Sequence, residues 1–372
     1  MKINIVVVGL GFGSSFVNIF QKHPNVGTVG IFDTDKELMN KIAHDLKSVK
    51  TYERFEDILK DDEIDAVHLV SPIFLHEEQS IAVLKANKHC ACTVPMATSL
   101  DGIRRITEAK RSLGKNYMMM ETTLYTYQFF YIQEMLKKGE FGRIQFMRGS
   151  HYQDMSGWPD YWMGLPPMYY GTHAIGPMVA LSGSRISRVV CLGSGTMDSS
   201  LHTQYGNPFP VESALFSFEN GMKGEATRTL FETVREYQEG LFIYGSEANF
   251  EWGFRDNDAP YVTRFSTDVN ERGKSTIPSQ IKMPNYAALL PEPLQTYTLR
   301  DGDFDPLNPQ LKGKGGGHHG SHPHLVHEFV MSIVEGRKPW IDEIMGGNIT
   351  AAGICAHESA MKDGTPVIVP LF

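Results

Sequence analysis

The feature that most constrains the fold of this chain is a glycine-rich loop between a strand and a helix. Ile3–Val8 is a nearly unbroken aliphatic run, which is typical of a strand buried on both faces of a parallel sheet. Residues 9–14 then read Gly-Leu-Gly-Phe-Gly-Ser, and Phe16, Ile19 and Phe20 follow at the spacing of one helical face. A strand, a tight glycine turn and a helix in this order predict the first unit of a doubly wound α/β sheet.

The alternation of strand and helix continues to about residue 122. Aliphatic strands are predicted at residues 29–32, 66–70, 89–94 and 118–120, with helical segments between them. Such serial units predict a parallel sheet with right-handed crossovers, here a Rossmann domain over residues 1–122. Residues 123–372 are predicted to form a second α/β domain with a mostly antiparallel sheet, because stretches of β-formers follow one another without helices of the earlier length.

Each position of the glycine loop has a physical role in binding a dinucleotide. Gly9 permits a tight turn, and Gly11 lets the backbone approach a pyrophosphate. Ser14 takes the third position of the fingerprint, where a small side chain allows the helix to pack closely on the strand. The helix N-terminus supplies amide donors and the positive end of a dipole to the phosphates. The predicted cofactor-binding residues of this loop are Gly9, Gly11, Phe12, Gly13 and Ser14.

Asp33 ends the second strand, twenty residues beyond Gly13. A carboxylate there binds the adenosine ribose hydroxyls and repels a 2′-phosphate. No arginine follows in the next turn, so NAD is predicted in preference to NADP. The alternative is that Asp33 caps a helix or stabilises a turn. Ser71 and Pro72 follow the third strand at the same carboxyl edge, and His76 after them is either a cofactor ligand or a helix-start residue.

Composition excludes several classes of function. The 372 residues carry a net charge of −8, and a mildly acidic surface disfavours nucleic acid as a partner. Every apolar run is shorter than the roughly 18 residues of a membrane span. The N-terminus is too short and strand-like for a signal peptide. Four scattered cysteines indicate buried, reduced thiols, so a cytoplasmic protein is expected.

The motifs of the first half resemble those of the glucose–fructose oxidoreductase/inositol dehydrogenase family (Gfo/Idh/MocA). The resemblance rests on the glycine loop, on Asp33, on the S-P-x-x-x-H of residues 71–76, and on Lys88-His89 leading to Pro95. It implies NAD(P)-dependent chemistry on sugars, inositols or related polyols. It also implies a cofactor site that includes Ser71, Pro72, His76 and Pro95.

The second half of the chain also fits the family. Gly139 and Gly142 precede a strand, and His173 stands at the start of a helix. The resemblance implies a C-terminal α/β domain with a large open sheet that often forms the dimer interface, so a homodimer or homotetramer is expected.

One departure from the family pattern concerns its catalytic lysine. The family usually carries E-K-P at the end of the fifth strand, whereas this chain reads Thr93-Val94-Pro95. Val94 cannot hydrogen-bond a hydroxyl or share its proton. Loss of a general acid–base group typically lowers a rate by roughly 10²–10⁴. Another residue therefore has the role, the chemistry differs, or the protein is not a catalyst.

Other residues resemble the NAD-dependent glycosidase branch of the family, which normally keeps that lysine. Tyr170-Gly-Thr172-His173 is similar to its Y-x-T-H, Glu121 stands where it has an active-site glutamate, and residues 316–320 are similar to its glycine–histidine loop. In that branch NAD oxidises C3 of the sugar, the C2 proton becomes acidic, elimination expels the aglycone, water adds and the hydride returns.

The resemblance implies a set of catalytic and substrate residues. A histidine has its pKa near working pH, so His173 can accept a hydroxyl proton, although it could instead cap its helix. Tyr170 is either a proton-transfer group or a wall of the cleft, and Glu121 is either a base or a hinge carboxylate. The predicted catalytic residues are His173, Tyr170 and Glu121, and the predicted substrate-binding residues are His151, Tyr152, Trp162, His318 and His319.

Residues 318–327 hold five of the fourteen histidines. On the helix expected to begin near Pro323, His324, His327 and Glu328 share one face, which could hold a metal with outside help. No cysteine or second carboxylate cluster accompanies them, so we expect no metal site and assign His318 and His319 to the sugar pocket.

Three functions follow from these residues. The first is an NAD-dependent oxidoreductase acting on a sugar, polyol or sugar derivative. The second is a glycosidase or lyase that recycles NAD. The third is a non-catalytic NAD or sugar sensor, which Val94 favours and the retained Tyr170 and His173 disfavour.

Overall fold

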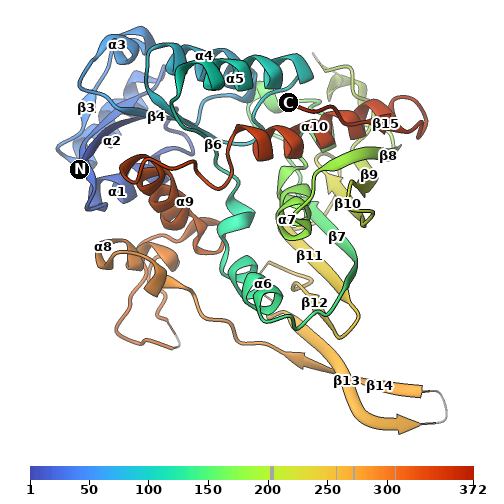
Figure 1. The fold of residues 1–372 in the computed structure, drawn as a ribbon. Helices are drawn as coiled ribbons and strands as arrows, with labels where there is room; N and C mark the ends of the chain where they lie inside the picture. The colour runs from blue at the N-terminus through green and yellow to red at the C-terminus, as the bar shows by residue number, and fades with distance from the viewer. Residues whose placement is uncertain (202–204, 257, 271–272, 306) are drawn as a thin grey trace. The chain divides into compact units, whose positions relative to one another are not determined.

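The computed structural model describes residues 1–201, 205–256, 258–270, 273–305 and 307–372. It divides into two compact units (Figure 1). Unit 1 comprises residues 1–127, 285–347 and 372, and unit 2 comprises residues 128–284 and 348–371. The sequence predicts two consecutive domains, 1–122 and 123–372, whereas in the structure residues 285–347 pack within the first unit.

Unit 1 is built on a six-stranded parallel sheet in the order β3-β2-β1-β4-β5-β6, which confirms the predicted Rossmann fold. Its strands are β1 (Ile3–Val8), β2 (Val26–Phe32), β3 (Lys50–Thr51), β4 (Ala66–Leu69), β5 (His89–Cys92) and β6 (Tyr117–Met119). The order reverses between β1 and β4, and ligands bind at the carboxyl ends of strands at such a point.

Helices connect these strands, and a late segment of the chain adds further helices to the unit. The first five are α1 (Ser14–Lys22), α2 (Lys36–Leu46), α3 (Phe55–Lys60), α4 (His76–Lys85) and α5 (Leu100–Leu113). From the late segment, α8 (Glu292–Gln295) and α9 (Gly317–Val334) join the unit, and α10 (Glu343–Ala360) begins in it. Helix α4 packs against α5, and α9 packs against α1.

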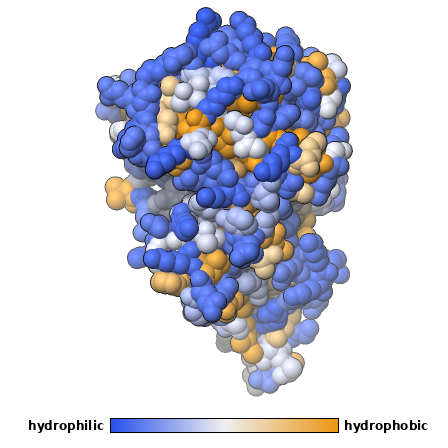
Figure 2. Space-filling model, turned by 90° about the vertical axis from the view of Figure 1, so that its left-hand side faces the viewer, coloured by the Kyte–Doolittle hydropathy of each residue, from blue (hydrophilic) through white to orange (hydrophobic). Residues whose placement is uncertain are grey.

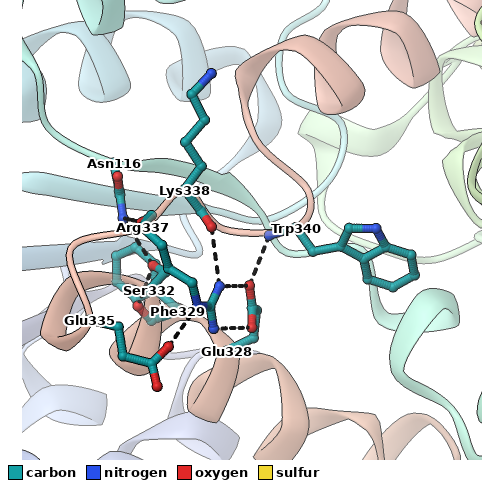
Figure 3. A network of polar contacts seen from close by, with 8 residues as sticks. All are labelled: Asn116, Glu328, Phe329, Ser332, Glu335, Arg337, Lys338 and Trp340. Atoms are coloured by element: carbon teal, nitrogen blue, oxygen red, sulfur yellow. Dashed lines mark hydrogen bonds and ion pairs between the residues drawn. The ribbon is translucent and has the colours of Figure 1, made fainter.

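A polar network fixes α9 and the segment after it to the sheet of unit 1 (Figure 3). The guanidinium of Arg337 donates to both carboxylate oxygens of Glu328, at 2.7 and 2.8 Å, and the Trp340 amide donates to the same carboxylate. The Asn116 side chain, just before β6, donates to Ser332 of α9 and to the Arg337 carbonyl. A two-point ion pair of this kind fixes orientation as well as distance. Residues 285–347 are therefore an integral part of unit 1.

Unit 2 is built on a nine-stranded sheet in the order β14-β13-β12-β11-β7-β10-β9-β8-β15. Among the described strand pairs of this sheet, β7 with β10 is parallel and the others are antiparallel, so the predicted mostly antiparallel sheet is confirmed. The strands are β7 (Ile144–Tyr152), β8 (Ile186–Ser194), β9 (Val211–Phe218), β10 (Lys223–Thr229), β11 (Gln238–Gly245), β12 (Ala248–Glu251), β13 (Tyr261–Asn270), β14 (Gly273–Gln280) and β15 (Val367–Ile368).

Unit 2 also contains helices α6 (Tyr127–Lys137) and α7 (Thr172–Ser182) and the greater part of α10. Helix α6 precedes the sheet, and α7 packs on β7 so closely that a Cβ added to Gly149 would lie 2.2 Å from the Ala174 carbonyl oxygen. The sequence predicts a long irregular excursion over residues 253–321. The structure differs in the first half of this stretch, where β13 and β14 pair in antiparallel fashion. Strand β14 is almost wholly exposed, so its sequence lacks the alternation of apolar and polar residues that marks a half-buried strand.

The surface in Figure 2 is mostly hydrophilic, with apolar residues gathered in small groups. Over the described residues, none of the helices has the length and apolar character that crossing a membrane requires. The four cysteines, Cys90, Cys92, Cys191 and Cys355, are buried and free.

Candidate functional site

The glycine loop between β1 and α1 contains two glycines that the fold requires and one that it does not. Gly9 has a φ of +88°, and a Cβ added to it would lie 2.6 Å from the Val70 carbonyl oxygen. A Cβ on Gly13 would lie 2.0 Å from the Gly9 carbonyl oxygen. A Cβ on Gly11 would meet nothing within 4 Å. Gly11 therefore borders open space, where the backbone is accessible to a bound pyrophosphate.

The third position of the fingerprint differs from the prediction. The sequence predicts that Ser14 allows the close packing of helix on strand. In the structure Gly13 makes that close approach, and Ser14 is the first residue of α1. A sequence pattern does not distinguish which of two adjacent small residues makes the closest approach.

Asp33 joins the glycine loop to the end of β2. Its Oδ2 accepts a hydrogen bond from the Leu10 amide at 2.6 Å, and its Oδ1 accepts one from the Asp35 amide at 2.9 Å. The side chain that caps α2 is Asp35, which accepts from the amides of Glu37 and Leu38. Asp33 is thus not the helix cap, and it holds a half-buried carboxylate beside the glycine loop.

The other predicted cofactor residues lie at the ends of β4 and β5. The Ser71 amide lies 2.8 Å from the position of a Cβ on Gly9, so this segment is packed directly against the glycine loop. His76 is fully buried, and its two ring nitrogens lie 2.7 Å from the Pro95 carbonyl and 2.9 Å from the Ser71 carbonyl. His76 therefore binds the two loops and does not face a ligand. Val94, where the family has its lysine, is 6% exposed.

The histidine-rich segment lies against the glycine loop. The rings of His318 and His322 lie edge-on to Phe12, with centroids 5.7 and 5.4 Å away. His318 and His319 have φ values of 43° and 50°, and the left-handed turn continues in Gly320. Nδ1 of His319 lies 3.3 Å from the hydroxyl of Tyr127. Within unit 1 these histidines are neighbours of the glycine loop. Their contacts with a sugar stay a prediction.

The helical face considered for a metal is occupied by other contacts. His327 Nδ1 lies 3.0 Å from His23 Nε2, and Glu328 is paired with Arg337. In the part of the chain that the structure describes, no group of three or more histidine, cysteine, aspartate or glutamate side chains could hold a metal ion.

Glu121, one of the three predicted catalytic residues, is buried after β6 in unit 1. It precedes a short 3-10 helix, Thr122–Tyr125, and its Oε1 accepts a hydrogen bond from the Thr123 amide at 3.1 Å. This is a helix-capping contact. Glu121 belongs to unit 1, whereas the other two predicted catalytic residues belong to unit 2.

Those other two residues form an aromatic cluster in unit 2. The His173 ring, near the start of α7, lies edge-on to His151 of β7 and to Tyr170, with centroids 4.8 and 5.5 Å away. Trp162 adds a further ring, 5.1 Å from Tyr170. Tyr152 does not join, since it follows His151 on a strand and its ring instead contacts Arg235. His151, Trp162, Tyr170 and His173 therefore make one site.

Three polar residues of this cluster are absent from the sequence prediction, of which Glu239 and Arg228 are buried and Tyr237 is half-buried. Glu239 of β11 places Oε1 3.9 Å from His173 Nδ1, and it accepts a hydrogen bond from the Tyr237 hydroxyl. Burial and the Glu239 carboxylate raise the pKa of Tyr237 well above its usual value, so this phenol stays protonated. Arg228 of β10 is the third, and burial lowers the pKa of its guanidinium to about 10.

Arg228 holds the backbone that carries the site. Its guanidinium donates to the carbonyls of Tyr170 at 3.1 Å and His151 at 3.3 Å, and it lies over the Tyr170 ring. In the sheet, His151 of the central strand pairs with Arg228 on one side and with Glu239 on the other. The available signal was the presence of charged residues inside strands, Arg228 in β10 and Glu239 in β11.

Comparison with known proteins relates unit 1 to one family. Residues 3–121 match the model of the oxidoreductase family with an NAD-binding Rossmann fold, GFO_IDH_MocA. Two curated relatives are Glycosyl hydrolase family 109 proteins. The one from Saccharopolyspora erythraea is 22% identical over 62% of this chain and 55% of its own length, and the one from Porphyromonas gingivalis is 26% identical over 63% and 53%. The chain thus matches about half the length of these relatives.

Solved structures share the fold over the whole chain. A levoglucosan dehydrogenase in complex with NADH and levoglucosan has a TM-score of 0.79 at 20% identity, with full coverage of both chains. A myo-inositol 2-dehydrogenase from Lactobacillus plantarum has a TM-score of 0.74 at 17% identity, again with full coverage. At these identities the likeness establishes the fold alone.

Proposed function

Since residues 3–121 belong to the Gfo/Idh/MocA family of NAD-binding oxidoreductases, we propose that this protein is an NAD-dependent oxidoreductase acting on a hydroxyl group of a sugar, polyol or sugar derivative. The observation that carries the proposal is the buried pair of His173 and Glu239 in unit 2. A base that accepts a hydroxyl proton becomes cationic, and a carboxylate beside it stabilises that cation.

The residues of unit 1 fit the dinucleotide. Gly11 offers an open approach to the backbone at the N-terminus of α1, where the helix supplies amide donors to a pyrophosphate. Asp33, already held by the Leu10 and Asp35 amides, is proposed to bind the ribose hydroxyls. When bound, the nicotinamide accepts the hydride. Asp33 is also our reason for proposing NAD in preference to NADP.

The residues of unit 2 are proposed to accept the proton of the reacting hydroxyl. His173 takes the proton of the reacting hydroxyl, Glu239 orients its ring, and the Tyr237 hydroxyl donates a hydrogen bond to Oε1 of Glu239, the same oxygen that faces His173. Arg228 fixes the backbone of Tyr170 and His151 around that base. Val94 has no group that can transfer a proton, so in this proposal the lysine of the family is replaced by the His173 pair.

A second candidate is a glycosidase in which NADH, formed when the sugar is oxidised, returns its hydride to the sugar after the glycosidic bond is broken. It is favoured by Tyr170 and Thr172 preceding His173, and by curated relatives named as Glycosyl hydrolase family 109 proteins. Both candidates begin with hydride removal from a sugar carbon. The distinguishing property is whether NADH accumulates.

The test is a screen of free sugars, polyols and aryl glycosides with the purified protein and NAD. An oxidoreductase forms NADH in proportion to the oxidised sugar. A redox-recycling glycosidase releases the aglycone with no net NADH. If NAD and sugars bind but neither product forms, the protein is a sensor and the proposed activity is wrong.

A further inference from the structure

His76 occupies an unusual position for a buried histidine, because carbonyl oxygens face both of its ring nitrogens. Nδ1 lies 2.7 Å from the Pro95 carbonyl oxygen, and Nε2 lies 2.9 Å from the Ser71 carbonyl oxygen. The side chain is 0% exposed, so water does not compete for either contact. The two carbonyls are acceptors without a hydrogen to give. The Thr93 hydroxyl also lies 3.5 Å from Nε2, but it donates its hydrogen to the Leu69 carbonyl, so it too faces the ring as an acceptor.

A neutral imidazole cannot satisfy this arrangement. It carries one N–H, so one carbonyl would face the lone pair of the other nitrogen, and a buried unsatisfied contact of this kind is destabilising. An imidazolium carries two N–H groups and donates to both carbonyls. Hydrogen bonds from a charged donor are also the stronger kind.

Some of the groups around His76 raise its pKa and others lower it. Burial lowers its pKa, while Cys92 of β5 and the carbonyls of Pro95 and Ser71 raise it, and the net pKa lies above the usual value. The amino terminus of α4, which His76 begins, opposes a positive charge, whereas Glu77 and Glu78 in its first turn favour one. On β4, burial and His76 lower the pKa of His68 to about 3, so the neighbouring ring is neutral.

The two loops that His76 joins lie at the carboxyl edge of the sheet. Ser71 follows β4 and packs against Gly9 of the glycine loop, and Pro95 follows Val94 after β5. A contact that fixes both carbonyls therefore fixes the edge at which a Rossmann sheet binds its ligand.

We propose that His76 is a positively charged imidazolium that positions the Ser71 and Pro95 loops for the cofactor, so that loss of its proton weakens nucleotide binding. His76 is a positioning residue, since it has no open face toward a ligand. The inference rests on the proposed NAD site but not on the proposed catalytic activity, and both of its tests can be made without a substrate.

The first test measures the charge directly. In protein labelled with ¹⁵N at histidine, the ring signals of His76 are assigned by their loss in His76→Gln. We expect both ring nitrogens to carry a proton at neutral pH. A His76 ring with one unprotonated nitrogen would overturn the proposal. If His76→Gln does not fold, the same signals are assigned in the unmodified protein by correlating each ring with its own backbone.

The second test follows NADH binding by fluorescence between about pH 6 and pH 10, above the usual pKa of histidine. We expect the dissociation constant to rise by about tenfold as His76 loses its proton, the equivalent of one hydrogen bond to a charged group. In His76→Gln the affinity should be weak throughout and independent of pH in this range. Asp33→Asn is the matched control, which should weaken binding at every pH and keep the pH dependence.

The outcomes separate the two proposals. A pH-independent affinity in the unmodified protein, with measurable NADH binding, contradicts the role of His76 and leaves the oxidoreductase proposal intact. Absence of NADH binding at every pH contradicts the cofactor site itself, and then the ring-nitrogen measurement alone decides the charge of His76.

Discussion

The Nδ1 atom of His173 lies 3.9 Å from the Oε1 atom of Glu239, and the two side chains are 4% and 0% exposed. His173 comes from α7 and Glu239 from β11, so the pair exists only after the sheet of unit 2 has formed. A buried carboxylate is costly unless it is hydrogen-bonded or paired, and here Tyr237 and His173 are its partners. Glu239 is therefore the residue that most directly controls the orientation and charge of the proposed base.

Replacing Glu239 by glutamine should lower kcat and leave KM nearly unchanged. The amide keeps the size of the side chain but cannot stabilise a cationic His173, so the loss should be at the lower end of the roughly 10²–10⁴ range for acid–base groups. Steady-state kinetics on the substrate found by the screen measures this. Glu236→Gln, on an exposed neighbour, is the matched control. Equal kinetics in Glu239→Gln and the control would remove Glu239 from the mechanism.

Replacing His173 by alanine should lower kcat by roughly 10²–10⁴ and leave NAD binding nearly intact. The reason is that the glycine loop and Asp33, which are proposed to hold the dinucleotide, belong to unit 1, whereas His173 belongs to unit 2. Kinetics and calorimetry on the same preparation measure the two effects. Full activity of the alanine variant would mean that another group takes the proton, whichever reaction is catalysed.

Replacing Asp33 by alanine should weaken NAD binding and narrow the preference for NAD over NADP. The carboxylate is proposed to accept from the ribose hydroxyls and to repel a 2′-phosphate, and it also holds the Leu10 amide of the glycine loop. Calorimetric titration with both nucleotides measures the ratio of affinities. Asp35→Ala, which removes only the cap of α2, should leave that ratio unchanged. Equal or tighter binding of NADP by the unmodified protein would contradict this assignment.

Replacing His68 by leucine should stabilise the protein, and more so in acid. In the described structure neither ring nitrogen of His68 has a hydrogen-bond partner, and burial with the nearby His76 lowers its pKa to about 3. His68 takes up a proton near pH 6.5 in the unfolded chain but only near pH 3 in the folded protein. As pH falls from 6.5 toward 3, protonation therefore favours the unfolded chain, and the free energy of unfolding of the unmodified protein decreases, whereas that of His68→Leu lacks this loss. Urea unfolding at pH 7 and pH 5 should show a gain of about 1 kcal/mol at the higher pH and a larger gain at the lower one.

The glycine loop of unit 1 and its contact with Asp33 were predictable because their signals are local in sequence. The glycine loop, the strand before it and Asp33 occupy one strand–helix–strand unit, and their spacing follows from the mechanism of dinucleotide binding. Which of Gly13 and Ser14 makes the close contact was not predictable, since that depends on the path of the backbone over Gly9.

The pair of His173 and Glu239 in unit 2 depends on long-range strand pairing. Glu239 reaches His173 because β11 pairs with β7 in the register that sets Glu239 opposite His151, and a shift of one residue would point it to the other face. A sequence pattern does not fix that register. The return of residues 285–347 to unit 1 was hidden for the same reason, because ion pairs such as Arg337 with Glu328 and bonds such as Asn116 with Ser332 follow from the folded path.

Replacing Val94 by lysine should lower activity on the natural substrate. Val94 is 6% exposed and follows β5 beside Pro95, whose carbonyl is already engaged by His76. A buried ammonium without a partner carries a large desolvation cost, and it would stand near the positive charge that we assign to His76. Val94→Met, of similar length and without charge, is the control that separates size from charge. Kinetics of both variants should show a greater loss with lysine than with methionine. A large gain of sugar dehydrogenase activity in Val94→Lys would instead show that the site retains the family's lysine-dependent geometry, and that the His173 and Glu239 pair does not replace it.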